Sequence, residues 1–204
     1  IAALASDNNT PLNNRLRYFR AFDFNTGPAK SALLLKMIQD NSSNDVALNK
    51  LVLRHLDNKT VTQTPVAQKA LKDVLQSIAG TDEYVEMVAR YSVKAENSNL
   101  LALAINKHDE RIGKDAAGLL LQLGGSQLVW DIINGADSIK QNSLLESMAG
   151  VGSKLSIDML QKIALSDKYS AALRKKSAGM IGRSWSGEER VLEILKAKKV
   201  PADL

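Results

Sequence analysis

Residues 112–124 of the chain read IGKDAAGLLLQLG and carry the clearest structural signal in the sequence. Their aliphatic side chains recur at intervals of three and four residues, which is the spacing of one face of an α-helix. Ala116 follows Ile112 by four residues, and its small side chain would let a neighbouring helix approach closely. Gly124 lies where a helix C-cap would fall. The stretch therefore predicts an inner helix that packs against other helices.

The same helical spacing recurs along the rest of the chain. The gaps between periodic segments are short and rich in Gly, Ser, Asn and Asp, as turns between helices require. No stretch shows convincing strand alternation, and the nearest, residues 61–63, is too short to matter. The expected helices cover residues 12–24, 28–40, 45–56, 65–79, 82–92, 97–107, 111–123, 126–134, 138–149, 154–166, 171–183 and 187–198.

Prolines and capping residues mark the ends of these segments. Proline fits the first turn of a helix or the position just past its end. The prolines at such boundaries are Pro11, Pro28, Pro65 and Pro201. The glycines expected at C-caps are Gly80, Gly124 and Gly135. Ser186 and Glu189 fit a capping box at the start of the last helix.

Four helices share an aliphatic residue followed four positions later by a small one. The pairs are Val66/Ala70, Ile112/Ala116, Ile139/Ser143 and Leu173/Ser177. Their spacing is irregular, as it often is in HEAT-like arrays. We expect an all-α fold, a HEAT-like alpha-alpha superhelix (solenoid) of about five or six helical hairpins, forming one domain over residues 1–204. A compact helical bundle is the alternative, because periodicity alone does not separate the two.

Composition excludes several classes of chemistry. The 204 residues include no cysteine, which removes disulfides, thiolate metal sites, a cysteine nucleophile and covalent c-type haem attachment. No phosphate loop, dinucleotide fingerprint or Gly-x-Ser-x-Gly elbow is present. His55 and His108 lack a second histidine at ligand spacing, and we expect residues 108–110 to form a solvated turn. We therefore assign no catalytic, metal or cofactor residue to this domain.

The net charge of +5 is a local property of one end. Residues 168–204 contain nine basic and four acidic residues, which accounts for the whole excess, while residues 1–167 are neutral overall. A basic end suggests an acidic partner, although a solvated helix face would have the same composition. No apolar run approaches the ~20 residues needed to span a bilayer. The chain begins at Ile1 without methionine, and we expect it to be a fragment of a longer protein.

Two segments are unusual enough to suggest contact surfaces. Residues 15–24 combine all three phenylalanines with Tyr18 and three arginines, and residues 173–190 combine basic residues with Trp185. Aromatic residues and arginine are the usual anchors of protein interfaces. The candidate interaction residues are Arg15, Arg17, Tyr18, Arg20, Phe22, Arg174, Lys175, Lys176, Arg183, Trp185 and Arg190. The alternatives are a hydrophobic cap over the first hairpin and a tryptophan that plugs a turn among solvated charges.

The same two segments carry a family resemblance. Residues 15–24 with the following Gly27-Pro28-Ala29-Lys30, and residues 173–192 with the closing KVPADL of residues 199–204, resemble the helical region of large bacterial multidomain proteins. Those proteins are described as membrane-bound dehydrogenases or haem-binding proteins. They combine a β-propeller, a HEAT-like region and a C-terminal c-type cytochrome. The resemblance implies a periplasmic or exported parent protein; the haem-attachment motif Cys-x-x-Cys-His is absent from this chain.

These observations predict a non-catalytic helical-repeat scaffold that links flanking domains or binds a protein partner. The domain itself is not expected to be an enzyme, although the resemblance implies that its parent is an oxidoreductase. On the scaffold interpretation, reversing the charges of residues 174–176 should leave the melting temperature nearly unchanged. The rival hypothesis is a HEAT-like DNA glycosylase or another nucleic-acid-binding helical-repeat protein, in which Trp130 with Asp131, or Trp185 with Arg183, would contribute to a cleft.

Overall fold

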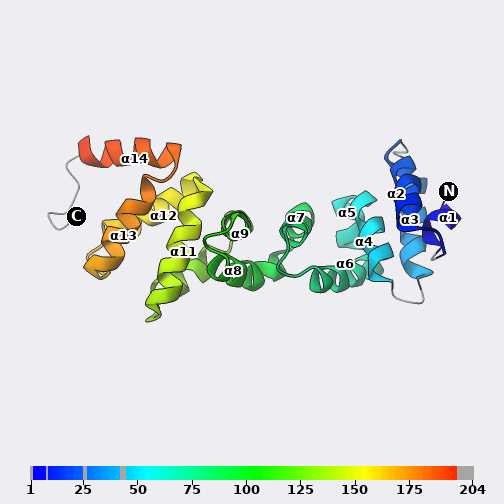
Figure 1. Ribbon diagram of the computed structural model, residues 1–204, viewed down its shortest axis with the longest axis horizontal. Coiled ribbons are helices and arrows are strands. Elements are labelled where there is room, and N and C mark those ends of the chain that lie inside the picture. The colour runs from blue at the N-terminus through cyan, green and yellow to red at the C-terminus, as the bar shows by residue number, and fades with distance from the viewer. Residues whose placement is uncertain (1, 8, 25–26, 42–44, 197–204) are drawn as a thin grey trace. The chain divides into compact units, whose positions relative to one another are not determined.

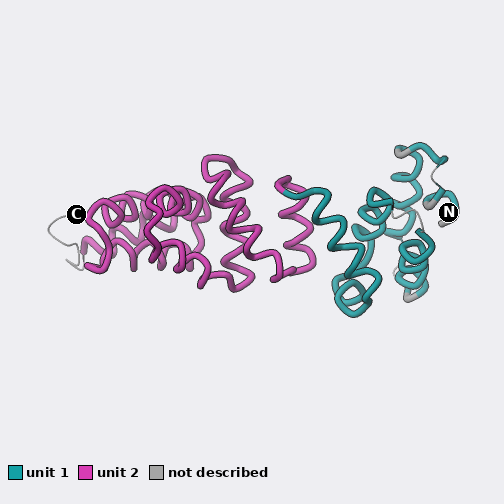
Figure 2. The backbone as a smooth tube through the Cα atoms, turned by 90° about the horizontal axis from the view of Figure 1, so that it is seen from below, with its two compact units in different colours: residues 1–79 teal, residues 80–204 magenta. Residues whose placement is uncertain are grey.

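The computed structural model describes residues 2–7, 9–24, 27–41 and 45–196, and in these ranges the chain is helical with no strand (Figure 1). The all-α prediction is confirmed. The chain divides into two compact units, residues 1–79 and residues 80–204 (Figure 2). Each unit is described by itself below. The expectation of one domain stays a prediction.

Unit 1 is built around helix α4. Its elements are α1 (Ala2–Ser6), α2 (Leu12–Arg20), the 3-10 helix η1 (Ala21–Phe24), α3 (Pro28–Gln39), α4 (Val46–His55), α5 (Asn58–Gln63) and α6 (Pro65–Ser77). Helix α4 contacts α2, α3 and α6. It begins where the Asp45 carboxylate accepts hydrogen bonds from the backbone N–H groups of Ala47 and Leu48, which are otherwise unsatisfied at a helix start. Its buried face includes Val52 and Leu53, which are fully buried.

Unit 2 contains the remaining elements. They are α7 (Asp82–Tyr91), the 3-10 helix η2 (Lys94–Glu96), α8 (Asn97–Asn106), α9 (Arg111–Gln122), α10 (Ser126–Ile133), α11 (Ser138–Val151), α12 (Lys154–Ala164), α13 (Ala171–Ile181) and α14 (Trp185–Lys196). Helices α7, α9, α12 and α14 contact one another in that order, as do α8, α11 and α13. Contacts between α8 and α9, α9 and α11, α11 and α12, and α12 and α13 join the two rows. Unit 2 is therefore a two-layered zigzag in which each helix contacts helices close to it in sequence.

The small residues predicted at close helix contacts are buried. Ala70, Ala116, Ser143 and Ser177 are each at most 9% exposed. The Ser177 hydroxyl donates to the Leu160 carbonyl oxygen at 2.8 Å, so burial leaves its polar group satisfied. The aliphatic half of the pattern fails once, because Ile139 is 77% exposed at the start of α11.

Two buried arginines make the same connection in different units. Each is the fourth residue of its helix, and its Nε donates to a carbonyl oxygen ten residues earlier, near the end of the preceding helix. Arg15 binds Ala5 at 3.1 Å, and Arg174 binds Ala164 at 3.3 Å. Each guanidinium also lies 3.4 Å from a carboxylate, that of Asp45 or Asp167. The last carbonyls of a helix lack intrahelical donors, so each arginine satisfies one of them from the next helix. We call this contact the arginine clamp.

Several details of the predicted boundaries differ from the structure. Helices α1 and α5 were not predicted, and residues 61–63, the nearest approach to a strand pattern, lie within or at the end of α5. Gly80 and Gly124 have the left-handed φ expected at a C-cap, whereas Gly135 does not and Gly152 does.

The predicted capping box at Ser186 is wrong, because α14 begins at Trp185, two residues before the predicted start at residue 187. Ser184 accepts the first hydrogen bonds instead, with the Gly187 N–H lying 3.2 Å from its Oγ. Gly187 accounts for this position of the helix start: a Cβ there would lie 1.7 Å from the Ile181 carbonyl oxygen. The start of α14 therefore packs directly on the end of α13.

Candidate interaction surface

The aromatic N-terminal segment forms α2 and η1 of unit 1. Arg17 and Arg20 lie at its surface, and Tyr18 is half-buried. Phe24, which was not among the expected contact residues, is 91% exposed. This part of unit 1 thus retains a surface with two cations and one large apolar ring.

Two other expected contact residues of this segment are buried. Arg15 is 7% exposed and forms the arginine clamp described above. Phe22 is 6% exposed, and its ring lies 5.8 Å from that of Phe19. Residues 21–24 form a 3-10 helix, in which successive side chains turn further than in an α-helix. Phe22 is therefore turned away from the helical face that α2 would continue, and it joins the core.

His55 is connected to this segment although sequence reasoning gave it no role. Its ring stacks on Phe19 with centroids 5.5 Å apart, and its Nδ1 and the Asp23 Oδ1 share a hydrogen bond of 2.7 Å. The contact joins the end of α4 to η1. Thirty-two residues separate His55 from Asp23, so no local motif could have indicated it.

Some basic residues of the C-terminal segment are exposed, and others form contacts inside unit 2. Lys175 and Arg183 are exposed, and Trp185 is 81% exposed. The alternative in which Trp185 plugs a hairpin turn is therefore wrong. These three residues remain candidates for a contact surface.

The other three basic residues of this segment are used inside unit 2. Arg174 is buried in its clamp. Lys176 on α13 places its Nζ 2.6 Å from the Glu146 Oε1 on α11. Arg190 on α14 lies 3.1 Å from Asp158 on α12 and donates to the Gln161 side chain at 3.0 Å. Each of them connects neighbouring helices, so the positive charge predicted for this end is only partly available to a partner.

Glu146 is the centre of a charged contact among three parts of unit 2. Besides Lys176, it approaches His108 in the turn after α8, with its Oε2 lying 2.8 Å from the histidine Nδ1. The hydrogen bond from Lys176 lowers the pKa of Glu146, and the charge of the lysine and the proximity of His108 act in the same direction against partial desolvation. His108 thus faces a neighbouring helix and not the following Asp109 and Glu110. Glu110 pairs with Lys107 at 2.8 Å.

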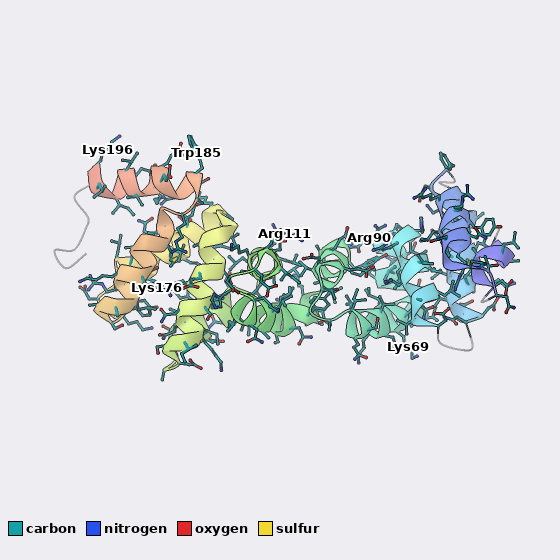
Figure 3. The ribbon with its side chains drawn as sticks, in the orientation of Figure 1. Lys69, Arg90, Arg111, Lys176, Trp185 and Lys196 are labelled. Atoms are coloured by element: carbon teal, nitrogen blue, oxygen red, sulfur yellow. The ribbon has the colours of Figure 1, made fainter. Side chains whose placement is uncertain are left out.

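The outer side of α14 is an apolar stripe that sequence analysis did not single out. Leu192 and Leu195 are each 55% exposed and share this side of the helix with Trp185. Figure 3 shows Trp185 and Lys196 pointing away from the rest of unit 2. The opposite side of α14 carries Gly187 and Arg190, which contact α13 and α12. The signal in the sequence was a second set of large apolar residues, Trp185, Leu192 and Leu195, of which the two leucines each follow a more buried aliphatic residue by one position.

A groove between α7, α9 and the end of α11 has a volume of about 570 Å³. Ala89 and Gly118 lie among its small lining residues, and charged side chains of both signs surround them. Arg111 lies 2.8 Å from Asp82 and 2.6 Å from Asp115, so its charge is already compensated. The groove therefore offers no uncompensated cation to an anionic ligand at Arg111.

Among the described residues, no group of three His, Asp or Glu side chains is placed to hold a metal ion. No single helix of the described chain is long and apolar enough to cross a membrane; α9 and α10 pass the length and composition test only as a pair, which bends by 116°. Comparison with protein families, with curated proteins and with solved structures finds no match to this chain.

Proposed function

We propose that this chain is a non-catalytic scaffold of the HEAT-like superhelix class, which holds flanking domains or a protein partner. The observation that carries the proposal is the order of contacts in unit 2, where each helix packs on helices near it in sequence and the rows advance together. In such arrays, stability is a sum over neighbouring repeats, and the stacked helices present an extended surface to partners. The arginine clamp, which connects consecutive helices in both units, supports a repeated building plan.

The contact surface that this proposal favours is the C-terminal end of unit 2. Trp185, Lys175 and Arg183 are exposed there, and the apolar stripe of α14 lies beside them. Exposed large apolar side chains next to cations are typical of protein-binding surfaces. In line with the family resemblance, we propose that the parent protein is an exported bacterial protein in which this array spaces a catalytic domain from a haem-binding one.

Deletion of α14 tests the repeat architecture. A chain ending at residue 184 should keep the helical circular-dichroism signal of its remaining helices and unfold at a somewhat lower urea concentration, because only the contacts of α14 with α12 and α13 are lost. A matched variant that lacks the interior helix α11 should not fold. Global unfolding on removal of α14 would instead favour a compact bundle.

A binding measurement tests the nucleic-acid rival. A glycosylase needs a cleft in which tryptophan, an acid and arginines converge, and the groove between α7 and α9 has no tryptophan in its lining. We expect fluorescence anisotropy of labelled duplex DNA to show no binding at low salt. Tight, salt-dependent binding would replace the scaffold proposal with the nucleic-acid one.

A further inference from the structure

Helix α14 has two sides of different character. Its inner side packs on α12 and α13 through Gly187 and Arg190. Its outer side carries Trp185, Leu192 and Leu195, which are 81%, 55% and 55% exposed. On helix α9, which belongs to the same row as α14, the exposed positions are by contrast Arg111, Asp115 and Gln122. The outer side of α14 is therefore an apolar surface of a kind that α9, a helix of the same row, does not have.

Charged residues on this outer side are arranged in a definite order. Glu188 and Glu189 precede Leu192 by four and three residues, and Lys196 follows it by four. At 3.6 residues per turn, Glu189 and Lys196 fall on the same flank of Leu192, one on each side along the helix axis. Both are exposed, and neither forms an ion pair with another residue that the structure describes. Leu192 is thus flanked by negative charge towards the start of α14 and by positive charge towards its end.

We infer that α14 is the contact helix of a homodimer, in which the outer stripes of two copies pack antiparallel about Leu192. A two-fold axis through Leu192 brings the two Leu192 side chains together and sets Glu189 of each copy against the partner's Lys196. The same surface is then used by both copies, as a two-fold interface requires. Parallel pairing would instead set Glu189 of each copy against the partner's Glu188, because the two glutamates lie on opposite flanks of Leu192.

The charge order selects a second copy over an unrelated partner. The Glu189 and Lys196 pair is complementary to its own reversed image, so a second copy can satisfy both of these charges. The helix has 12 residues and is about 18 Å long, so the interface is small and the dimer is weak and concentration-dependent. This inference goes beyond the proposed scaffold function, because an array can hold partners as a monomer or as a dimer.

Sedimentation equilibrium of the full chain, over roughly a hundredfold range of concentration, tests the inference. The average mass should rise from 22.2 kDa towards twice that value. Glu189→Lys and Lys196→Glu should each weaken the dimer about tenfold, because each change places like charges together at two symmetric sites. The double variant Glu189→Lys/Lys196→Glu exchanges the charges and should return the dissociation constant to within about threefold of the original.

Two further variants distinguish association through the α14 stripe from non-specific hydrophobic association. Leu192→Lys places a charge at the centre of the interface and should leave a monomer with an unchanged circular-dichroism spectrum. Leu155→Lys removes another exposed leucine of unit 2, on α12, and should leave the dimer intact. A wild-type chain that stays monomeric at the highest concentration, or a double variant that does not recover, would overturn the dimer and leave the scaffold proposal standing.

Discussion

Arg174 shows how a single residue can belong to the interior of a protein although its sequence neighbourhood suggests a surface. It lies beside Lys175 and Lys176 in a basic run, yet it is 7% exposed and donates to the Ala164 carbonyl oxygen. The binding atom lies ten residues earlier, in another helix, where no periodic pattern connects the two. The same is true of Arg15 and Ala5. For this reason the charged candidates were the least predictable part of the site.

Replacement of Arg174 by methionine should therefore destabilise the fold. Methionine keeps most of the apolar stem but leaves the Ala164 carbonyl without its donor, and the expected loss is about 1–3 kcal/mol of unfolding free energy. The matched change Lys175→Met, one residue further along and exposed, should stay within about 0.5 kcal/mol of wild type. Urea denaturation measures both. The sequence-based expectation was that charge reversal at residues 174–176 would leave the stability unchanged, and the buried Arg174 argues against it. Equal unfolding free energies for the two variants would support that earlier expectation.

Glu146 gives the fold a pH-dependent contact. Its pKa is lowered from the ordinary 4.5, first by the hydrogen bond from Lys176. A carboxylate whose pKa is lower in the folded state stabilises the fold above its unfolded pKa, and that contribution is lost as the pH falls through the folded value. Glu146→Gln should therefore cost about 1 kcal/mol at neutral pH, since the side chains are partly exposed, and much less under acid conditions.

The measurement for Glu146 is the difference in unfolding free energy between wild type and variant at pH 7 and at pH 3. Lys140→Met, at an exposed pair with Asp137, serves as a control for the loss of a surface charge pair. If Glu146→Gln lowers the unfolding free energy by the same amount at both pH values, Glu146 contributes by packing and not by its charge.

Periodicity predicted most of the helices. Each of the twelve expected helices is present, and most of their starts and ends agree with the structure within one or two residues; the predicted end at residue 198 and the boundary at Pro201 lie outside the described residues. The two unpredicted helices, α1 and α5, have five and six residues, too few for an apolar row to repeat. Residues 21–24 form a 3-10 helix, whose different rotation per residue no α-helical pattern could anticipate. Short elements and changes of helix type thus account for the main errors.

The junction of α13 and α14 depends on Gly187. A Cβ at this position would lie 1.7 Å from the Ile181 carbonyl oxygen, so Gly187→Ala should push the start of α14 away from α13. We expect a loss of about 2 kcal/mol or more. Gly179→Ala is the matched control, because Gly179 lies inside α13 with nothing within 4 Å of its added Cβ, and it should stabilise the protein by about 0.5–1 kcal/mol. Thermal unfolding of the two variants should therefore shift in opposite directions, and shifts in the same direction would contradict this role of Gly187.

For the whole molecule, the sequence predicted an all-helical chain, which the structure confirms, and a single superhelical domain over residues 1–204, which stays a prediction. Composition and periodicity depend on neighbours within about seven residues, whereas the division at residue 79 depends on contacts between helices. The structure also shows which basic residues of the positively charged C-terminal end are accessible. Part of the basic end is used in the clamp of Arg174 and in ion pairs of Lys176 and Arg190, which leaves Lys175, Arg183 and the α14 stripe as its accessible surface.

In the proposed array, the stability of unit 2 comes from contacts between neighbouring helices. Native-state hydrogen exchange of the full chain, measured amide by amide, tests this claim most directly. We expect a gradient in which amides of α14 exchange through the smallest opening free energy, those of α13 through a larger one, and those of the interior helices α9 and α11 through the largest. A single opening free energy shared by α9, α11, α13 and α14 would contradict it, because that result describes one cooperative bundle.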